Sequence, residues 1–131
     1  SSAHNYGLWW TEQGRDADGK PTWTRHDIYT KLSQSHALQM ADMNGDGLPD
    51  LITGKRFYAH NGHDPGAHDP AALYWFEFSR PGGKPTWTPR LIDDNSGIGT
   101  QFVVADINGD QRLDIVTSNK KGTFVFTQIA E

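Results

Sequence analysis

The sequence predicts an all-β protein built from a repeated unit, and three observations support this. The chain has 131 residues with 14 glycines and 7 prolines, and only 35% of its residues are hydrophobic, a balance typical of short strands joined by many turns. Its short apolar and β-branched runs are separated by polar or Gly/Pro turns, and no segment shows a helical period. An acidic nine-residue segment also occurs twice, 64 positions apart.

The two acidic segments define the repeat. They read Asp42-Met43-Asn44-Gly45-Asp46-Gly47-Leu48-Pro49-Asp50 and Asp106-Ile107-Asn108-Gly109-Asp110-Gln111-Arg112-Leu113-Asp114. The same spacing relates the Gly-Lys-Pro-Thr-Trp-Thr segments at 19–24 and 83–88. Apolar runs precede the acidic segments (37–41 and 102–105), and β-branched runs follow them (51–53 and 115–117). Each copy therefore predicts a hairpin whose turn is the acidic loop.

Five further segments are predicted strands because they are aromatic or alternate aromatic and polar residues: 8–10, 22–28, 73–78, 86–92 and 123–127. We expect about two four-stranded antiparallel units, with repeat 1 at about 8–72 and repeat 2 at about 73–131. Within a unit the expected order is the aromatic strand, the Trp-Thr strand, the strand before the loop and the strand after it.

A repeated four-stranded unit of this length is typical of a β-propeller blade. Propeller rings need roughly four to eight blades, and residues 1–131 form a single segment with about two. The chain is therefore expected to be a fragment of a larger propeller, with a homo-oligomer that closes the ring as the alternative.

The acidic loops have the composition of a cation site. Oxygen-bearing side chains stand at positions 1, 3, 5 and 9 of both copies, and Ca²⁺ binds six to eight oxygens at roughly 2.3–2.6 Å. Two calcium sites are predicted. An EF-hand is excluded because position 12 is Thr53 or Thr117 and the flanks are β-rich. The remaining alternative is an Asx-turn hairpin without an ion.

The loop motif, followed by Leu51-Ile52-Thr53-Gly54 in the first copy, resembles the FG-GAP/VCBS repeat, the blade unit of integrin α-subunit propellers and of many exported bacterial proteins. The similarity is strongest over 34–57 and 98–122. It implies calcium ligation by side chains and, at Leu48 and Arg112, by backbone carbonyls. The implied ligands are Asp42, Asn44, Asp46, Leu48 and Asp50 in loop 1, and Asp106, Asn108, Asp110, Arg112 and Asp114 in loop 2.

The two loops differ at position 6, which is Gly47 in loop 1 and Gln111 in loop 2. A sharp turn often requires a positive φ at this position, which costs a residue other than glycine about 1 kcal/mol. Loop 2 is therefore expected to bind calcium more weakly or with adjusted geometry.

Composition excludes several classes of function. The net charge is −4 and the sequence contains no basic stripe, which argues against nucleic-acid binding. No apolar run is long enough to span a membrane. The absence of cysteine excludes disulfides without defining a compartment. Because calcium loops of this kind bind weakly, we expect a secreted, periplasmic or extracellular protein.

A histidine-rich insertion distinguishes repeat 1 from repeat 2. His60, His63 and His68 lie within nine residues beside two Asp-Pro pairs, and His36 begins the strand expected to pair nearby. These four histidines are the candidate catalytic residues. One interpretation is a transition-metal or sugar-acting site, and the other is a solvated polar loop. The insertion also shows a short resemblance to propellers of aldos-2-ulose dehydratase type, which act on keto-sugars.

These observations favour a calcium-binding repeat module that serves as a binding or scaffold domain for a carbohydrate or protein ligand. The chain alone is not expected to be an enzyme. The alternative is part of a sugar-processing enzyme, of lyase or dehydratase type, with the histidine-rich loop and His36 near the substrate.

Overall fold

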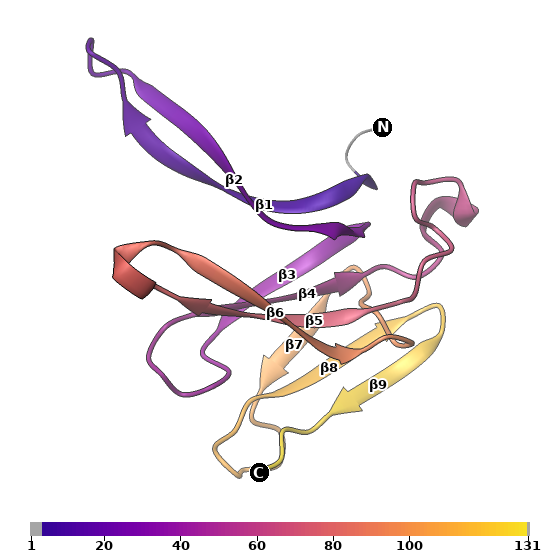
Figure 1. The fold of residues 1–131 in the computed structure, drawn as a ribbon. Helices are drawn as coiled ribbons and strands as arrows, with labels where there is room; N and C mark the ends of the chain where they lie inside the picture. Colours follow the sequence, from indigo (N-terminus) through magenta and orange to yellow (C-terminus); the bar gives the residue numbers. More distant parts are fainter. Residues whose placement is uncertain (1–3, 131) are drawn as a thin grey trace.

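The computed structural model describes residues 4–130 and shows three antiparallel β-sheets (Figure 1). The first is a hairpin of β1 (Tyr6–Arg15) and β2 (Pro21–Ser33). The second has the order β3 (Ser35–Ala41), β4 (Asp50–Lys55), β5 (Leu73–Ser79) and β6 (Thr86–Asp93). The third has the order β7 (Phe102–Ala105), β8 (Asp114–Asn119) and β9 (Gly122–Phe126).

The all-β prediction is confirmed, and each of the nine predicted strands overlaps one of the strands β1–β9. Both acidic segments connect antiparallel neighbours, as predicted: Ala41 is opposite Asp50 at the end of β3–β4, and Ala105 is opposite Asp114 at the end of β7–β8. Helical structure in residues 4–130 is limited to short 3₁₀ turns, including η2 (Ala59–Gly62) and η3 (Pro81–Gly83).

The grouping of strands into sheets differs from the expected two sets of four. The described strands form sheets of two, four and three, and they do not close into a ring. The four-stranded sheet begins with the strand before the acidic loop and ends with the Trp-Thr strand. The sheet therefore combines the end of the first expected repeat with the start of the second. By its place in the repeat, the hairpin β1–β2 corresponds to the pair β5–β6 of this sheet.

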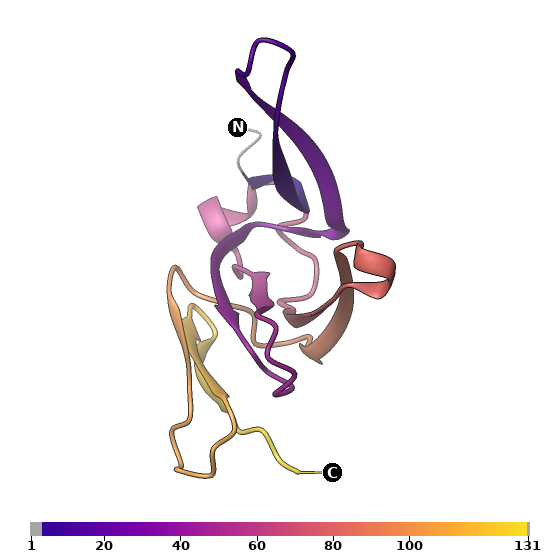
Figure 2. The same ribbon diagram turned by 90° about the vertical axis from the view of Figure 1, so that its left-hand side faces the viewer.

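Two hydrophobic clusters pack the sheets as successive layers, and strand β4 contributes to both. Ile52, which is fully buried, lies in a cluster shared with β7 and β8, whereas Leu51 lies in a cluster shared with β1. This follows from strand geometry, since successive side chains point to opposite faces. The four-stranded sheet is thus covered on one face by the hairpin and on the other by the three-stranded sheet (Figures 1 and 2).

The insertion between β4 and β5 lies beside the start of β1, far from both acidic loops (Figures 1 and 2). Among residues 4–130, no helix is long and apolar enough to cross a membrane.

Candidate functional site

The first carboxylate of each acidic loop organises its turn. The Oδ1 atom of Asp42 accepts a hydrogen bond from the Gly45 amide at 2.8 Å, and Oδ2 accepts one from the Gly47 amide at 2.8 Å. In loop 2 the corresponding amides of Gly109 and Gln111 donate to Asp106 at 2.7 and 2.8 Å. The backbone therefore wraps around one carboxylate in the same way in both copies.

Positions 3 and 5 repeat the pattern. In loop 1, Oδ1 of Asn44 accepts from the Asp46 amide at 3.0 Å, and Oδ1 of Asp46 accepts from the Leu48 amide at 2.8 Å. The corresponding distances in loop 2, for Asn108 and Asp110, are both 2.9 Å. In each loop the side-chain oxygens of positions 1, 3 and 5 thus accept hydrogen bonds from backbone amides of the same short turn.

The position-9 carboxylates have a second role that the sequence did not indicate. Asp50 and Asp114 are both fully buried. Oδ2 of Asp50 accepts from the Met43 amide at 3.0 Å, and Oδ1 accepts from the Phe78 amide on β5 at 2.8 Å. Asp114 accepts likewise from Ile107, at 3.1 Å, and from Gln128, at 2.9 Å. Each therefore joins its loop to the aromatic strand of the same sheet or to the residues just after it.

Backbone amides also favour the charged form of the first carboxylate in loop 2. The hydrogen bond from the Gln111 amide, with further bonds from Gly109, Asp110 and Asn108, holds the pKa of Asp106 below its usual value, while partial desolvation opposes this. The side chain is therefore ionised, as a cation ligand must be, throughout the neutral range.

Loop 2 differs from loop 1 in two ways that both disfavour a cation. Gln111 has a φ of 68°, in the left-handed region, where Gly47 has a φ of 84°. The expected positive φ at position 6 is confirmed, and a glutamine adopts it at a cost. In addition, the Arg112 guanidinium donates to Oδ2 of Asp110 at 2.7 Å, where loop 1 has an uncharged leucine.

The loops are neighbours in the fold. A cavity of about 230 Å³ is bounded by Asp42, Asn44, Gln111 and Arg112, among others. Across this region the Gln128 side-chain amide donates to the Met43 carbonyl at 3.1 Å. The two expected cation positions therefore share one end of the molecule.

The histidine-rich insertion is held at several points along its length. The Tyr6 hydroxyl donates to Asp69 at 2.5 Å, the Gln34 amide donates to the Pro65 carbonyl at 3.2 Å, and the buried Lys55 ammonium donates to the Ala67 carbonyl at 3.2 Å. A loop tied to β1, to the residue before β3 and to β4 has a defined position relative to the rest of the fold.

The four candidate histidines do not converge. His60 contacts Asp64, with 2.7 Å between Nδ1 and Oδ2, and forms a cluster with Asp64 and His4. His63 and His68 are exposed and do not belong to this cluster. His36 is exposed and stacks on His4, with 6.0 Å between ring centroids. His4 is the member that sequence reasoning missed, because it stands alone near the N-terminus, 56 residues before His60.

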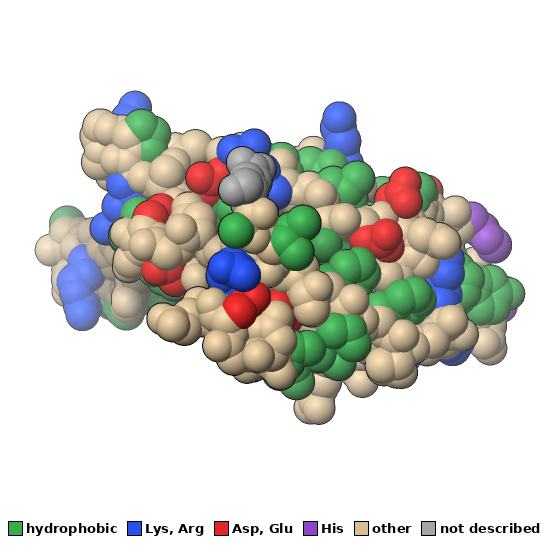
Figure 3. Space-filling view, turned by 90° about the horizontal axis from the view of Figure 1, so that it is seen from below, with side chains coloured by type: hydrophobic (Ala, Val, Ile, Leu, Met, Phe, Trp, Pro, Cys, Tyr) green, Lys and Arg blue, Asp and Glu red, His purple; other side chains and the backbone are tan. Residues whose placement is uncertain are grey.

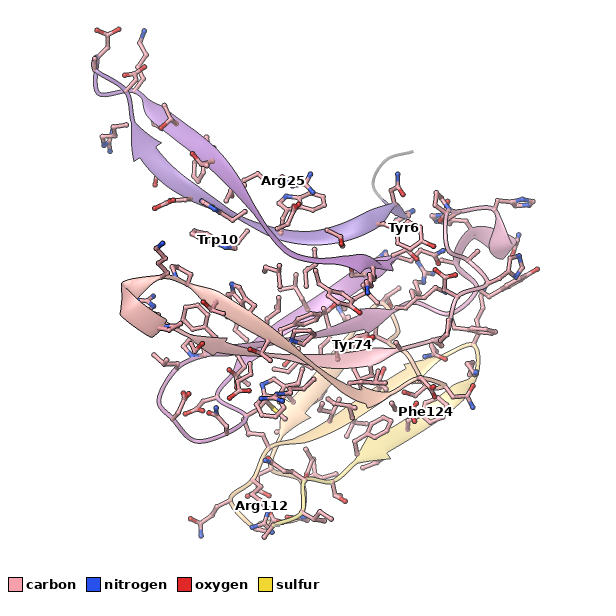
Figure 4. All side chains as sticks on the ribbon, viewed as in Figure 1. Tyr6, Trp10, Arg25, Tyr74, Arg112 and Phe124 are labelled. Carbon is pink, nitrogen blue, oxygen red and sulfur yellow. The ribbon has the colours of Figure 1, made fainter. Side chains whose placement is uncertain are left out.

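A cleft of about 790 Å³ separates the hairpin β1–β2 from the start of β6. Trp10 points from β1 towards this cleft (Figure 4) and stacks on His26 at a centroid distance of 4.4 Å, while Trp87 lines the opposite side. Glu12 and Asp27 add carboxylates to the lining. Two indoles with nearby polar groups are suited to a ligand that has apolar faces and hydroxyl edges.

Comparison of the chain with protein-family models, with curated proteins and with solved structures found no match.

Proposed function

We propose that this chain is a calcium-binding β-repeat module of FG-GAP/VCBS type, a segment of a β-propeller that serves as a binding or scaffold domain. Each acidic loop binds one Ca²⁺, and the sheets are blades whose uncovered faces meet further blades of a longer protein or of a second copy. Export to a calcium-rich compartment is part of the proposal, because loops of this kind bind weakly.

The observation that carries the proposal is the matching hydrogen-bond pattern of the two loops. Six hydrogen bonds within loop 1, from Asn44, Gly45, Asp46, Gly47 and Leu48, have counterparts in loop 2 at the same positions. Two sequences that differ at positions 2, 6, 7 and 8 thus fold around the same oxygens. Backbone amides stabilise the carboxylates of each turn, and a bound Ca²⁺ would neutralise their mutual repulsion further.

The proposal is tested by calorimetric titration of the metal-free chain with Ca²⁺. We expect two sites per chain, with the weaker one in loop 2. Asp42→Ala should remove the tighter site, and Asp106→Ala should remove the weaker one. The matched control is Asp18→Ala, which changes an exposed aspartate in the β1–β2 turn and should leave both sites intact.

Circular dichroism of each variant in the absence of calcium checks that the fold persists. Absence of calcium uptake at millimolar concentrations by the folded wild-type chain would contradict the proposal. Equal loss of binding in Asp18→Ala would do so as well.

A second function, carbohydrate binding, is favoured by the cleft between Trp10 and Trp87. Tryptophan faces stack on sugar rings, and Glu12 and Asp27 could accept hydrogen bonds from hydroxyl groups. The test is a titration of a panel of neutral mono- and oligosaccharides, monitored by tryptophan fluorescence.

We expect quenching that saturates with at least one sugar and is lost in Trp10→Ala. Trp23→Ala is the matched control, since Trp23 is 63% exposed and does not line the cleft. A response that persists in Trp10→Ala, or no saturable response to any sugar, would rule out this function for the cleft.

A further inference from the structure

We propose that His4, His60 and Asp64 form a binding site for a divalent transition metal of the zinc class. The site lies where the segment before β1 meets the η2 turn of the insertion (Figures 1 and 2). It is independent of the two acidic loops, which belong to the β3–β4 and β7–β8 connections.

The ligand atoms are already close to the separation that a metal requires. One nitrogen of each imidazole and one oxygen of Asp64 lie within 4.8 Å of one another. The Nδ1 atom of His4 is 3.4 Å from Oδ2 of Asp64. Ligands of a tetrahedral zinc ion, bound at roughly 2.0–2.2 Å, are about 3.3 Å apart. The His4–Asp64 distance therefore matches one edge of the coordination tetrahedron, and His60, now at 2.7 Å from Asp64, needs only a small shift.

His4 also has a nitrogen without a hydrogen bond to any residue between 4 and 130. Its Nδ1 atom is buried and finds no hydrogen-bond partner in this described part of the chain, although the carboxylate of Asp64 stands beside it. A buried polar atom without a partner is costly. A metal bound between the two groups would satisfy the nitrogen and the carboxylate together.

The ligand set selects the class of metal. Two imidazole nitrogens and one carboxylate suit zinc and its neighbours among the divalent transition metals, whereas calcium prefers an all-oxygen shell. The side chain of His60 is 50% exposed and that of Asp64 is 14% exposed, so solvent reaches one side of the site. Three protein ligands leave a fourth coordination position for water or an external ligand.

A bound ion would join two distant parts of the chain. His4 and His60 are 56 residues apart in sequence, yet their rings are 4.4 Å apart between centroids. The Tyr6–Asp69 hydrogen bond already connects the same two segments. Metal binding should therefore hold the start of the β1–β2 hairpin more firmly against the insertion. It would also provide an open coordination position.

The experiment uses the untagged chain, saturated with Ca²⁺ so that the acidic loops are filled, and titrates it with Zn²⁺ alone and with Co²⁺ alone. We expect one Zn²⁺ per chain beyond the calcium, a higher melting temperature on binding, and a visible Co²⁺ spectrum of tetrahedral type. His4→Ala, His60→Ala and Asp64→Asn should each weaken Zn²⁺ binding by at least tenfold. His63→Ala and His68→Ala, which change exposed histidines of the same insertion, should bind as the wild type does.

Two results would overturn the proposal. One is the absence of stoichiometric Zn²⁺ binding to the folded chain, which would leave Asp64 as a carboxylate shared by two imidazoles without an ion. The other is an equal loss of affinity in His63→Ala or His68→Ala. Calcium uptake by the acidic loops is measured separately on the same samples, so failure of this site is distinguishable from failure of the calcium proposal.

Discussion

At the scale of single residues, position 6 of the acidic loop shows how one side chain can distinguish two copies of a motif. Gly47 and Gln111 both have a positive φ, and both donate their amide to the first carboxylate of their loop. The turn is therefore dictated by the hydrogen bonds, and glutamine adopts a backbone conformation that glycine adopts without steric cost.

Exchanging these two residues should change stability in opposite directions. Gln111→Gly should stabilise the chain by up to about 1 kcal/mol and tighten calcium binding by loop 2, because it relieves the left-handed strain. The reciprocal Gly47→Gln should destabilise by a similar amount and weaken loop 1. Urea unfolding and calcium titration of both variants measure these effects. The same sign of change in both variants would contradict this explanation.

Lys55 is a second residue whose environment has a measurable consequence. It is 1% exposed, and burial lowers its pKa below the usual value of a lysine, with the charge of Asp69 opposing the shift in part. Because the unfolded chain then holds the proton to higher pH than the folded chain, stability should rise as pH increases through the folded pKa towards 10.5.

We expect the free energy of unfolding to rise with pH on the alkaline side, below 10.5, in the wild type and to lose this rise in Lys55→Met. The variant keeps a side chain of similar length without a titratable group. Urea unfolding at several pH values is the measurement. Tyr74, whose hydrogen bond with the Tyr29 hydroxyl raises its pKa to about 12, contributes an opposing loss of stability that begins only as the pH approaches the unfolded value of 10.0. An identical pH dependence in both proteins would refute the role of Lys55.

At the scale of elements, strand β4 determines how the layers stack. All six of its residues are buried, because it lies inside its sheet and both faces are covered. Its neighbour β3 alternates instead: Leu38 and Met40 are exposed on the face that carries Leu51, whereas Ala37 and Ala41 pack on the other face against the cluster shared with β7 and β8.

This contrast predicts different costs of truncation. Ile52→Ala should destabilise the chain by about 2–4 kcal/mol, because it opens a cavity between two sheets. Met40→Ala, on the adjacent strand, should change stability by no more than about 0.5 kcal/mol. Thermal and urea unfolding compare the two variants. Similar costs for both would show that β4 is not the shared centre of the stack.

The sequence predicts the strands well because their signals are local. Alternation, β-branched runs and turn residues identified all nine strands and both loop hairpins. The grouping of strands into sheets could not be predicted, because a repeat can be taken to begin at any of its strands. Only the hydrogen bonds between strands show that β3 and β6 are the two edges of one sheet. His4 and the buried roles of Asp50 and Asp114 depend on contacts between distant segments, for which the sequence holds no local signal.

At the scale of the whole molecule, the stack of sheets has two uncovered ends. Trp9 and Trp23 are exposed on the hairpin, 46% and 63% respectively, while Val103 and Val125 are exposed on the three-stranded sheet. Figure 3 views the molecule from below, the side on which the three-stranded sheet lies in Figure 1, and shows hydrophobic side chains gathered beside acidic ones there. Apolar sheet faces and open strand edges of this kind favour association.

We therefore expect the isolated chain to self-associate as its concentration rises. Sedimentation velocity should show this association, and Val125→Lys should reduce it because a charge would be placed on the uncovered face. Thr22→Lys, which adds the same charge to an exposed residue on the face of β2 opposite Trp23, is the matched control. A chain that remains monomeric at about 100 μM would refute association through these faces.

Calcium binding by the acidic loops can be observed directly in crystals of the chain grown with Ca²⁺ and measured for anomalous scattering. We expect one peak in each acidic loop, about 2.3–2.6 Å from the oxygens of positions 1, 3 and 5. The peak should have lower occupancy in the loop that contains Gln111 and Arg112. Ordered loops without a peak, at millimolar calcium, would show that these loops are not calcium sites.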